Sequence, residues 1–295
     1  MSVPGSFLSW WKQKTYLMSR RTNVIAAALS LLALGSSVIT ACANPLANNS
    51  FNSGVDKYEQ GDYQGAIADF TKTLEINPQY ASAFLNRGVA KTKLGDYQGA
   101  IADFTKALEI NPEYAKAFHN RGAAKAELGD YQGAIADYDK AIEVDPKDAV
   151  AYYNRGNAKS VLGDYQGAIS DYKKALEINP KFALAYYNRG NTKSNLEDHQ
   201  GAIADYNKSI EINPRYSDAY ESRGTSKSNL GDYQGAVADY NKALEINPQN
   251  TSAYVNRGIA RELMNDLQGA CDDWRKAAEL GEKEPEKWVI QQCQE

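Results

Sequence analysis

The chain has 295 residues, of which 43% are hydrophobic and 24% are charged, and its formal net charge at pH 7 is −4. This composition is that of an ordinary soluble protein, and the even spread of Lys and Arg gives no basic footprint for nucleic acid. The three cysteines are too few to build a disulfide scaffold.

The first 43 residues have the layout of a targeting segment. Val24–Ala43 is a run of twenty residues without a charge, and Arg20 and Arg21 precede it. A basic region, an apolar region and small residues at the end are typical of a signal peptide. A compact version of the same leader starts at Met18, so either Met1 or Met18 can be the start. The polar residues 44–49 are expected to form a short tether.

Three outcomes are open for this segment. The sequence Ile39–Cys42 resembles a lipobox, in which Cys42 is lipidated and becomes the new N-terminus. Cleavage after Ala43 also fits, because small residues flank Cys42 there. An uncleaved anchor is the third outcome, because twenty helical residues can just span a bilayer. In each case the positive flank stays in the cytoplasm and the rest of the chain is exported, to the periplasmic side of a membrane.

The rest of the chain is organised by one recurring stretch, Gly163–Tyr172. Copies recur at steps of 34 residues, and seven are present without slippage. The other six are Gly61–Phe70, Gly95–Phe104, Gly129–Tyr138, Glu197–Tyr206, Gly231–Tyr240 and the worn copy Asn265–Trp274. A fixed period of this length indicates a solenoid of helical hairpins, in which each unit packs on its neighbours. We expect the repeats to span residues 50–284, with the first one worn at its start.

Each repeat is predicted to hold two helices joined by a tight turn. In the fourth copy, Gly163 ends the first helix as a C′ residue, and Asp164 caps the second helix. Asn179 and Pro180 stop the second helix, because the residue before proline is pushed out of the helical region. Gly156 is small, so that the two helices can approach closely. The apolar stripe of the hairpin is expected at Leu162, Ile169, Leu176 and Ile178.

Repeat positions are counted here from Ala149 as position 1; the equivalent first residues are Ala47, Ala81, Ala115, Ala183, Ser217 and Thr251. Position 8 is then glycine and position 20 is alanine in all seven copies, position 24 is always aromatic, and position 32 is proline in six. This pattern resembles the tetratricopeptide repeat over about four-fifths of the chain.

The resemblance implies an all-α fold, a right-handed solenoid of seven helix-turn-helix repeats with a C-terminal capping helix. It further implies a concave groove lined by the first helices that binds a protein or an extended peptide, without catalysis and without a cofactor. The style of the repeats resembles that of bacterial envelope proteins, including exported lipoproteins.

Two positions depart from the family pattern. Position 7 is arginine in six copies and position 23 is aspartate in all seven. We predict that the two side chains pair across each hairpin, as Arg155 with Asp171; the alternative is a solvated row of charges. Position 11 is lysine or arginine in every copy.

The candidate binding residues lie on the first helices. Position 6 is asparagine in six copies, and related repeats use such a ladder to hold peptides. An amide both donates and accepts hydrogen bonds, so it can grip a peptide bond; the alternative is that these amides bond to their own scaffold. Positions 5, 9 and 12 are expected to form the side-chain pockets, position 12 being Ser160 and Ser194 in the fourth and fifth copies. The predicted set is Asn86, Asn120, Asn154, Asn188 and Asn256, with Tyr153, Tyr187, Asn157 and Asn191.

The C-terminus carries two further predictions. Residues 285–295 are expected to form a capping helix over the last apolar face. An antiparallel turn near Glu282 would bring Cys271 and Cys293 together, which in an exported protein favours a disulfide over two buried thiols.

The sequence holds little that indicates chemistry. His119 and His199 lie in different repeats, and no Cys–His metal spacing, nucleophile elbow or phosphate-binding loop is present. We therefore expect a non-catalytic binding scaffold in the cell envelope, without a metal site. The alternative function is that of a membrane-anchored assembly factor for membrane protein complexes.

Overall fold

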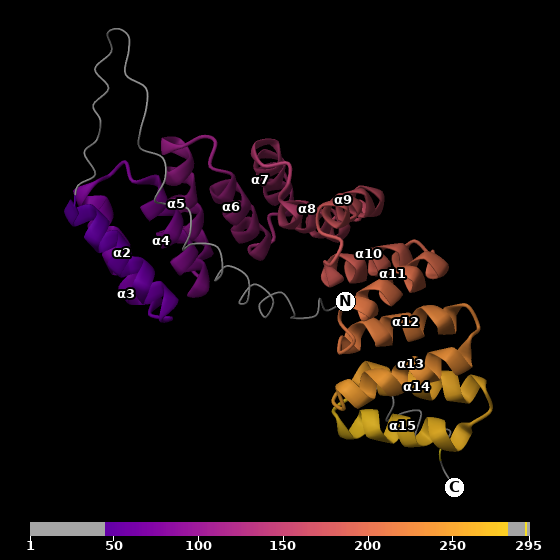
Figure 1. The fold of residues 1–295 in the computed structure, drawn as a ribbon. Coiled ribbons are helices and arrows are strands. Elements are labelled where there is room, and N and C mark those ends of the chain that lie inside the picture. Colours follow the sequence, from indigo (N-terminus) through magenta and orange to yellow (C-terminus); the bar gives the residue numbers. More distant parts are fainter. Residues whose placement is uncertain (1–44, 283–292, 294–295) are drawn as a thin grey trace. The chain divides into compact units, whose positions relative to one another are not determined.

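The structure is a computed structural model that describes residues 45–282 and 293. Fourteen α-helices follow one another in this part of the chain, with no β-strand among its residues (Figure 1). The helices are α2 (Pro45–Glu59), α3 (Tyr63–Ile76), α4 (Ala81–Lys93), α5 (Tyr97–Ile110), α6 (Ala115–Glu127), α7 (Tyr131–Val144), α8 (Ala149–Val161), α9 (Tyr165–Ile178), α10 (Ala183–Asn195), α11 (His199–Ile212), α12 (Ser217–Asn229), α13 (Tyr233–Ile246), α14 (Thr251–Leu263) and α15 (Leu267–Glu279). The predicted all-α solenoid of helical hairpins is confirmed.

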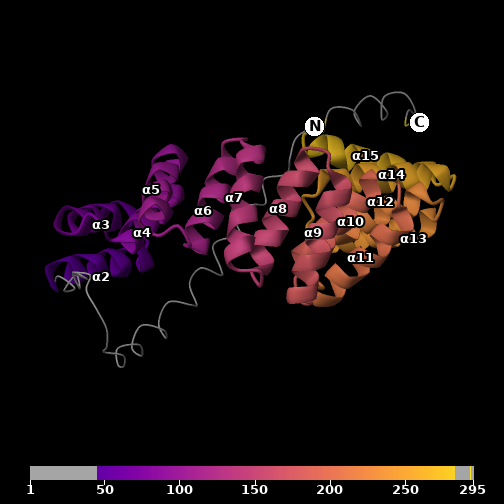
Figure 2. The same cartoon turned by 90° about the horizontal axis from the view of Figure 1, so that it is seen from above.

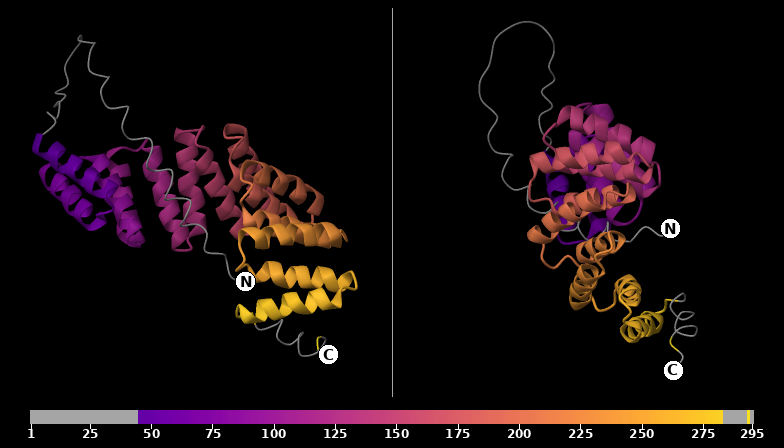
Figure 3. Two further views of the ribbon diagram at one scale, coloured as in Figure 1. Left: turned by 60° about the horizontal axis from the view of Figure 1, so that its bottom comes forward. Right: turned by 90° about the vertical axis from the view of Figure 1, so that its right-hand side faces the viewer.

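The chain divides into two compact units, one up to Ile110 and one from Asn111. The first unit holds the hairpins α2/α3 and α4/α5, which Figure 2 shows as two pairs of neighbouring helices. The second unit holds the five hairpins from α6/α7 to α14/α15. In Figure 3 the helices α14 and α15 lie side by side in yellow. In both units, each hairpin packs on the next one along the chain.

The predicted turn chemistry is confirmed in the fourth repeat. Gly163 has a φ of 83°, in the left-handed region that glycine adopts without steric cost. The carboxylate of Asp164 accepts a hydrogen bond from the backbone N–H of Gly167 at 3.0 Å, so it caps α9. In the fifth and seventh repeats the same turn is made by Glu197 and Asn265, with φ of 62° and 63°. A side chain is strained in that conformation, most of all one that is not asparagine or aspartate.

The glycine at position 8 allows the two helices of a hairpin to approach closely. A Cβ atom added at Gly156 would lie 2.9 Å from Cε1 of Tyr172, which is closer than real Cβ contacts. Tyr172 is fully buried and fills the space that the missing side chain leaves. The small residue and the large ring are therefore two halves of one packing contact.

The predicted arginine–aspartate pairs are present in every repeat that has the arginine. In the fourth repeat, Nε of Arg155 lies 2.9 Å from Oδ2 of Asp171, and Nη2 lies 2.6 Å from Oδ1. The bidentate geometry matches the two planar groups. The equivalent pairs are Arg87–Asp103, Arg121–Asp137, Arg189–Asp205, Arg223–Asp239 and Arg257–Asp273. Only 4% of the Asp171 side chain is exposed, so the alternative of a solvated charge row is wrong.

The sequence reasoning missed the second cation on each aspartate. Nζ of Lys159, at position 11, lies 2.8 Å from Oδ2 of Asp171. The guanidinium of Arg155 also bonds Asp139 of the preceding repeat at 2.6 Å, and its carbon lies 5.4 Å from the centre of the Tyr152 ring. Burial lowers the pKa of Arg155, but the bonds and charges of the two aspartates outweigh it and raise that pKa. We name this recurring arrangement of positions 7, 11 and 23 the charge ladder.

Two sequence-based expectations are corrected. The helix α2 begins at Pro45, and Ala47 is buried, so residues 45–49 are the first turn of a helix and not a tether. Proline is favoured in a first helical turn because its missing N–H has no partner there anyway. Leu162 and Ile178 are 42% and 38% exposed, because they lie at the helix ends, and they do not belong to the buried stripe.

The predicted targeting segment 1–43 and the capping helix 285–295 lie outside the described residues, apart from Cys293. Among the helices that are described, none combines the length and the apolar composition needed to cross a bilayer.

Candidate functional site

The candidate binding residues lie on the first helices, which form the inner row of the second unit. Each of α6, α8, α10 and α12 contacts the next first helix of the row, up to α14. Successive second helices make no comparable contacts within the described residues. The repeats therefore approach one another most closely on the side of the first helices. We name this side the first-helix face.

The position-6 side chains link neighbouring repeats. Nδ2 of Asn188 donates to the hydroxyl of Tyr153, at position 5 of the preceding repeat, at 2.9 Å. The same contact recurs with different partners: Asn154 with His119 at 3.3 Å, Ser222 with Tyr187 at 3.5 Å and Asn256 with Glu221 at 3.3 Å. The amide nitrogens are therefore bonded to the scaffold, as the alternative to peptide binding expected. The Oδ1 atoms of Asn154, Asn188 and Asn256 accept no hydrogen bond from described residues.

Two predicted binding residues behave differently. Nδ2 of Asn86, in the first unit, donates to the carbonyl of Ser82 in its own helix at 2.8 Å. The side chain of Asn120 makes no hydrogen bond to the described part of the chain. The predicted asparagine ladder is thus uniform in sequence but not in contacts.

The joint between the fourth and fifth repeats holds a polar network around Asn157, whose buried Nδ2 has no hydrogen-bond partner among the described residues. Oδ1 of Asn157 accepts from the hydroxyl of Tyr172 at 2.7 Å and from Nδ2 of Asn188 at 2.9 Å. Tyr153 is buried, and this burial raises its pKa to about 12, although hydrogen bonds with Asn157 and Asn188 oppose the rise. Tyr153, predicted as a pocket residue, is thus mainly part of the joint.

The next joint, between the fifth and sixth repeats, has fewer hydrogen bonds. Oδ1 of Asn191 accepts from the hydroxyl of Tyr206 at 2.7 Å, as Asn157 does one repeat earlier. Here position 6 is Ser222, whose short side chain reaches only Tyr187. Asn191 therefore has one donor fewer than Asn157.

Aromatic pairs fill the joints. The sequence analysis singled out the first ring of each pair, at position 5, but not the second. The ring centres of Tyr153 and Phe182 lie 4.8 Å apart, as do those of Tyr187 and Tyr216. Phe182 and Tyr216 are the last residues of their repeats. The aromatic type recurs at this position in most copies, and that was the signal available.

At one joint a histidine and an aspartate replace the aromatic pair. Nδ1 of His119 lies 3.2 Å from Oδ2 of Asp148, although the two are not aligned for a hydrogen bond. Burial raises the pKa of Asp148, but His119 and the backbone N–H groups of α8 outweigh it and lower that pKa. His119 therefore has a structural partner. The described residues contain no group of three or more His, Cys, Asp or Glu side chains that could hold a metal ion.

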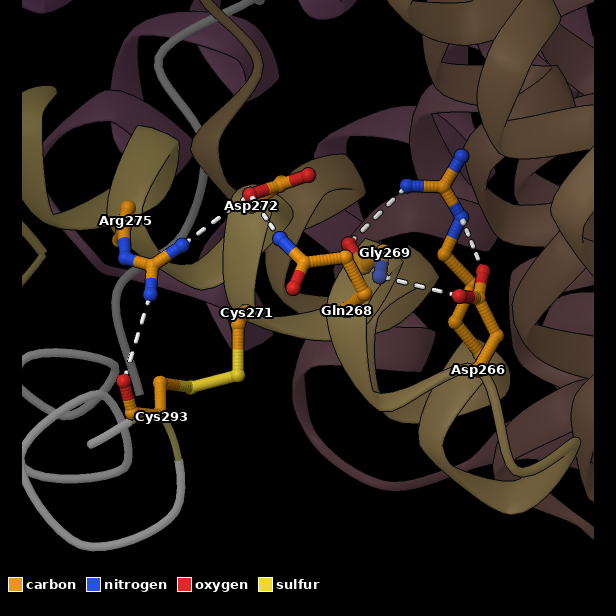
Figure 4. Close-up of a disulfide and its surroundings, with 8 residues drawn as sticks. Asp266, Gln268, Gly269, Cys271, Asp272, Arg275 and Cys293 are labelled. Atoms are coloured by element: carbon orange, nitrogen blue, oxygen red, sulfur yellow. Dashed lines mark hydrogen bonds and ion pairs between the residues drawn. A yellow bond between two sulfur atoms is a disulfide. The ribbon is translucent and has the colours of Figure 1, made fainter. Parts of the chain in front are cut away.

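The structure joins the two C-terminal cysteines. Figure 4 shows the bond between Cys271 and Cys293, whose Cα atoms are 5.7 Å apart. Nη2 of Arg275 donates to the carbonyl of Cys293 at 3.4 Å. Cys271 is buried on α15. The oxidised state of this pair in the protein stays a prediction, and Cys42 lies outside the described residues.

Comparisons with known proteins agree with the repeat pattern. Three family models match, each in several places. The model described as tetratricopeptide repeat matches residues 81–114, 149–182 and 183–216, and the one described as TPR repeat matches 54–95, 124–160 and 229–265. A further tetratricopeptide repeat model matches 104–136 and 205–238. Together the matches run from residue 54 to residue 265. A comparison with curated protein sequences gives no match.

Solved structures with the same fold are similar to this chain. A crystal structure of MamA is 31% identical, with a TM-score of 0.53, over 55% of this chain and 95% of its own. YrrB, described as a TPR protein with an unusual peptide-binding site, is 26% identical, with a TM-score of 0.55, over 64% of this chain and 97% of its own. A tetratricopeptide repeat protein from Parabacteroides merdae ATCC 43184 is 23% identical, covers 85% of this chain and 100% of its own, and has a TM-score of 0.63, which shows the fold alone.

Proposed function

Because the chain belongs to the tetratricopeptide repeat family, whose folds generally serve as scaffolds for protein interaction, we propose that it is a non-catalytic scaffold of the bacterial cell envelope. Its partner is a protein or an extended peptide that lies along the first-helix face.

One observation carries this proposal. The packing residues of the hairpins hardly change from copy to copy, whereas the side chains on the first-helix face do. Position 2, for example, is Lys116, Val150, Leu184, Asp218 and Ser252 in successive repeats of the second unit, and none of these residues is buried. A constant scaffold with a variable face is expected where different side chains of a partner are recognised in turn. YrrB, a similar chain described as a TPR protein with an unusual peptide-binding site, supports the same function here.

The scaffold contacts of the asparagines decide which variants test the proposal. Replacing Asn154 or Asn188 would break joints between repeats as well as any contact to a partner. We therefore choose Ser160→Arg with Ser194→Arg, which places bulk on α8 and α10 at position 12 of the first-helix face. These changes remove only long hydrogen bonds, from Ser160 to Thr192 at 3.4 Å and from Ser194 to His199 at 3.5 Å. The matched control is Ser170→Arg with Ala204→Arg, which adds the same charge on exposed positions of the second helices α9 and α11.

The experiment is a crosslinking pulldown from envelope fractions, followed by mass spectrometry of the captured proteins. We expect the first variant to lose partners that the wild type and the control retain. Retention of the same partners by both variants would remove the first-helix face from the proposed mechanism.

Export and lipid anchoring through Cys42 complete the proposal. It is supported by the basic and apolar layout of residues 1–43 and by the lipobox-like Ile39–Cys42. Mass analysis of the mature N-terminus tests it. An acylated Cys42 is expected; a start at Asn44 indicates cleavage after Ala43. An intact N-terminus would favour the membrane-anchored assembly factor, since Val24–Ala43 is then a permanent anchor.

A further inference from the structure

One joint of the first-helix face contains a histidine between two polar side chains. At the joint of the third and fourth repeats, Nδ1 of His119 lies 3.2 Å from Oδ2 of Asp148, and Nε2 lies 3.3 Å from Nδ2 of Asn154. The His119 side chain is only 13% exposed. Histidine is the residue whose ordinary pKa places a change of charge between about pH 5 and pH 8. This joint therefore holds a group that can change charge under mild conditions.

The carboxylate selects which ring nitrogen carries the proton of the neutral histidine. Oδ1 of Asp148 accepts from the backbone N–H groups of Val150 and Ala151, so that the N-cap of α8 holds the carboxylate with Oδ2 towards the ring. Burial raises the pKa of Asp148, but His119 and these N–H groups outweigh it and lower that pKa, so the group is ionised at neutral pH. A negative charge beside Nδ1 favours the proton there, which leaves Nε2 as the acceptor for an N–H of Asn154.

Two other titratable groups face the ring, from α7 and from α6 itself. The ring of Tyr138 on α7 lies 5.8 Å from that of His119, edge to face. Burial, Glu127 and Asp137 raise the pKa of Tyr138, so its hydroxyl stays uncharged. Lys116 stands three residues before His119 on α6, on the same side of the helix, but it is exposed and its charge is screened by water and salt. Asp148 is therefore the charge that acts on the ring most directly.

A second proton on the ring changes the contact with Asn154. It binds Nε2, because Nδ1 is already protonated, and two donors then face each other. Oδ1 of Asn154 accepts no hydrogen bond from the described residues, so the amide can turn over without breaking another bond. We propose that Asp148, His119 and Asn154 form a proton-operated switch, in which protonation of His119 reverses the amide of Asn154. The first-helix face then presents an acceptor at this joint at neutral pH and a donor in acid.

The switch goes beyond the proposed function, because the amide reverses whether or not a partner is bound. Its consequence for a bound segment does rest on the proposed function. At neutral pH, Oδ1 of Asn154 accepts from an N–H of the segment, whereas in acid Nδ2 donates to a C=O. A segment in a fixed register therefore loses this hydrogen bond when His119 changes its protonation state.

Nuclear magnetic resonance of the mature protein, labelled with ¹⁵N in histidine and asparagine, tests the switch from about pH 8 to about pH 5. The chain has two histidines, and His199→Tyr identifies which ring signals belong to His119. Asn154→Ser identifies the amide signals of Asn154. At neutral pH we expect the ring proton on Nδ1 and a strong nuclear Overhauser effect between the ring and the Nδ2 protons. In acid, as the ring gains its second proton, this effect should weaken severalfold because those protons have turned away.

Asn188 is the control within the same spectra. Its Nδ2 donates to the hydroxyl of Tyr153 at 2.9 Å, and burial raises the pKa of that hydroxyl to about 12, so this amide should not respond to pH. In His119→Tyr the response of Asn154 should be lost as well. An Overhauser effect that stays strong while the ring gains its second proton would overturn the switch, as would a ring that does not titrate in this range. The wild type alone gives both results, even if a variant does not fold.

The variant Asp148→Asn tests the part of the carboxylate. Asparagine can keep the N-cap, as Asn250 does at the equivalent place by accepting from the N–H of Ala253 at 3.0 Å. Without the negative charge, the neutral ring should divide its proton between both nitrogens, and the amide of Asn154 should be partly reversed already at neutral pH. A proton that stays on Nδ1 would reject Asp148 as part of the switch. Since no partner is added, failure of the switch leaves the proposed function intact.

Discussion

The charge ladder and the first-helix face belong to the same repeats but follow different rules. In the ladder, Asp171 and its equivalents meet one arginine and one lysine at nearly the same distances in five copies, and two arginines in the seventh. On the first-helix face, position 6 reaches position 5 of the preceding repeat in the fourth to seventh repeats, but the partner is a histidine, a tyrosine or a glutamate.

The difference lies in which repeat supplies the contact. The ladder is closed mainly within one hairpin, so each copy must satisfy its own buried aspartate. The joints of the first-helix face lie between two copies, and any acceptor at position 5 satisfies the donor at position 6. A joint therefore tolerates different residue types at position 5.

The largest expected effect is on the ladder. In Asp171→Asn, two cations lose their anion at a site that water reaches poorly, and we expect the free energy of unfolding to fall by about 3 kcal/mol. Chemical denaturation measures it. The control is Glu177→Gln, whose exposed pair with Lys174 should make no measurable difference. A double-mutant cycle on Arg155 and Asp171 with a coupling near zero would contradict the ladder as a source of stability.

The seventh repeat has the Cys271–Cys293 bond in addition to its part of the charge ladder. If Cys271 and Cys293 are bridged, the loop between them spans 22 residues, and Cys271→Ser should lower the free energy of unfolding by about 2 kcal/mol. The same loss is expected in wild-type protein under reducing conditions. Two free thiols in the mass spectrum of unreduced protein would reject the bridge.

The joint is expected to be weaker than the ladder. Asn188→Ala removes the donors to Tyr153 and Asn157, and we expect a loss of about 1 kcal/mol in the free energy of unfolding. Asn120→Ala is the matched control, because the side chain of Asn120 makes no hydrogen bond to the described residues. Equal losses in the two variants would show that the hydrogen bonds of Asn188 do not stabilise the joint, and the comparison between joint and ladder would fail.

A pH dependence separates the two kinds of carboxylate. Because the pKa of Glu221 is raised in the folded protein, its contribution to stability is full below the unfolded pKa and is lost as pH rises through the folded pKa. Glu221→Gln should therefore gain stability over the wild type as pH rises from acid to neutral. Glu211→Gln, on an exposed site, should show no such trend. If the difference in the free energy of unfolding between Glu221→Gln and the wild type is the same at acid and at neutral pH, the raised pKa is contradicted.

The smallest effect concerns one missing contact. Position 25 of the preceding repeat offers Asp139 to Arg155, but it offers Lys173 to Arg189, and no bond forms there among the described residues. Lys173→Asp should provide the acceptor and raise the free energy of unfolding by about 0.5 kcal/mol. Lys173→Gln is the control for the loss of repulsion alone, and the aspartate variant should exceed it.

The sequence predicted the hairpins because every local signal recurs. The glycine at Gly163, the cap at Asp164 and the proline at Pro180 each specify a backbone conformation, so the turns could be read residue by residue. It also predicted that Arg155 meets Asp171, since sixteen residues separate them in every copy. The start of α2 was wrong, because a polar stretch after a proline suits a helix start as well as a tether.

The candidate site was harder to predict because its contacts cross between repeats. Asparagine at position 6 has the same sequence signature whether it holds a partner or Tyr153. The sequence pattern does not tell which last residue of a repeat packs against Tyr153 or Tyr187. That Asp218 and Glu221 form no ion pair with described residues could be recognised only in the structure, where the position-23 aspartates are seen with their cations.

The position-25 contacts also bear on how the second unit comes apart. A guanidinium that binds both its own hairpin and the one before it, as Arg155 does, ties the opening of the two hairpins together. Where Lys173 interrupts this series, the polar contacts between the two hairpins are neutral hydrogen bonds, from Asn188 to Tyr153 and Asn157 and between Ser160 and Thr192. The array then has a seam between α9 and α10 at which cooperative unfolding would stop first, so that amide exchange should divide the unit into blocks at this point.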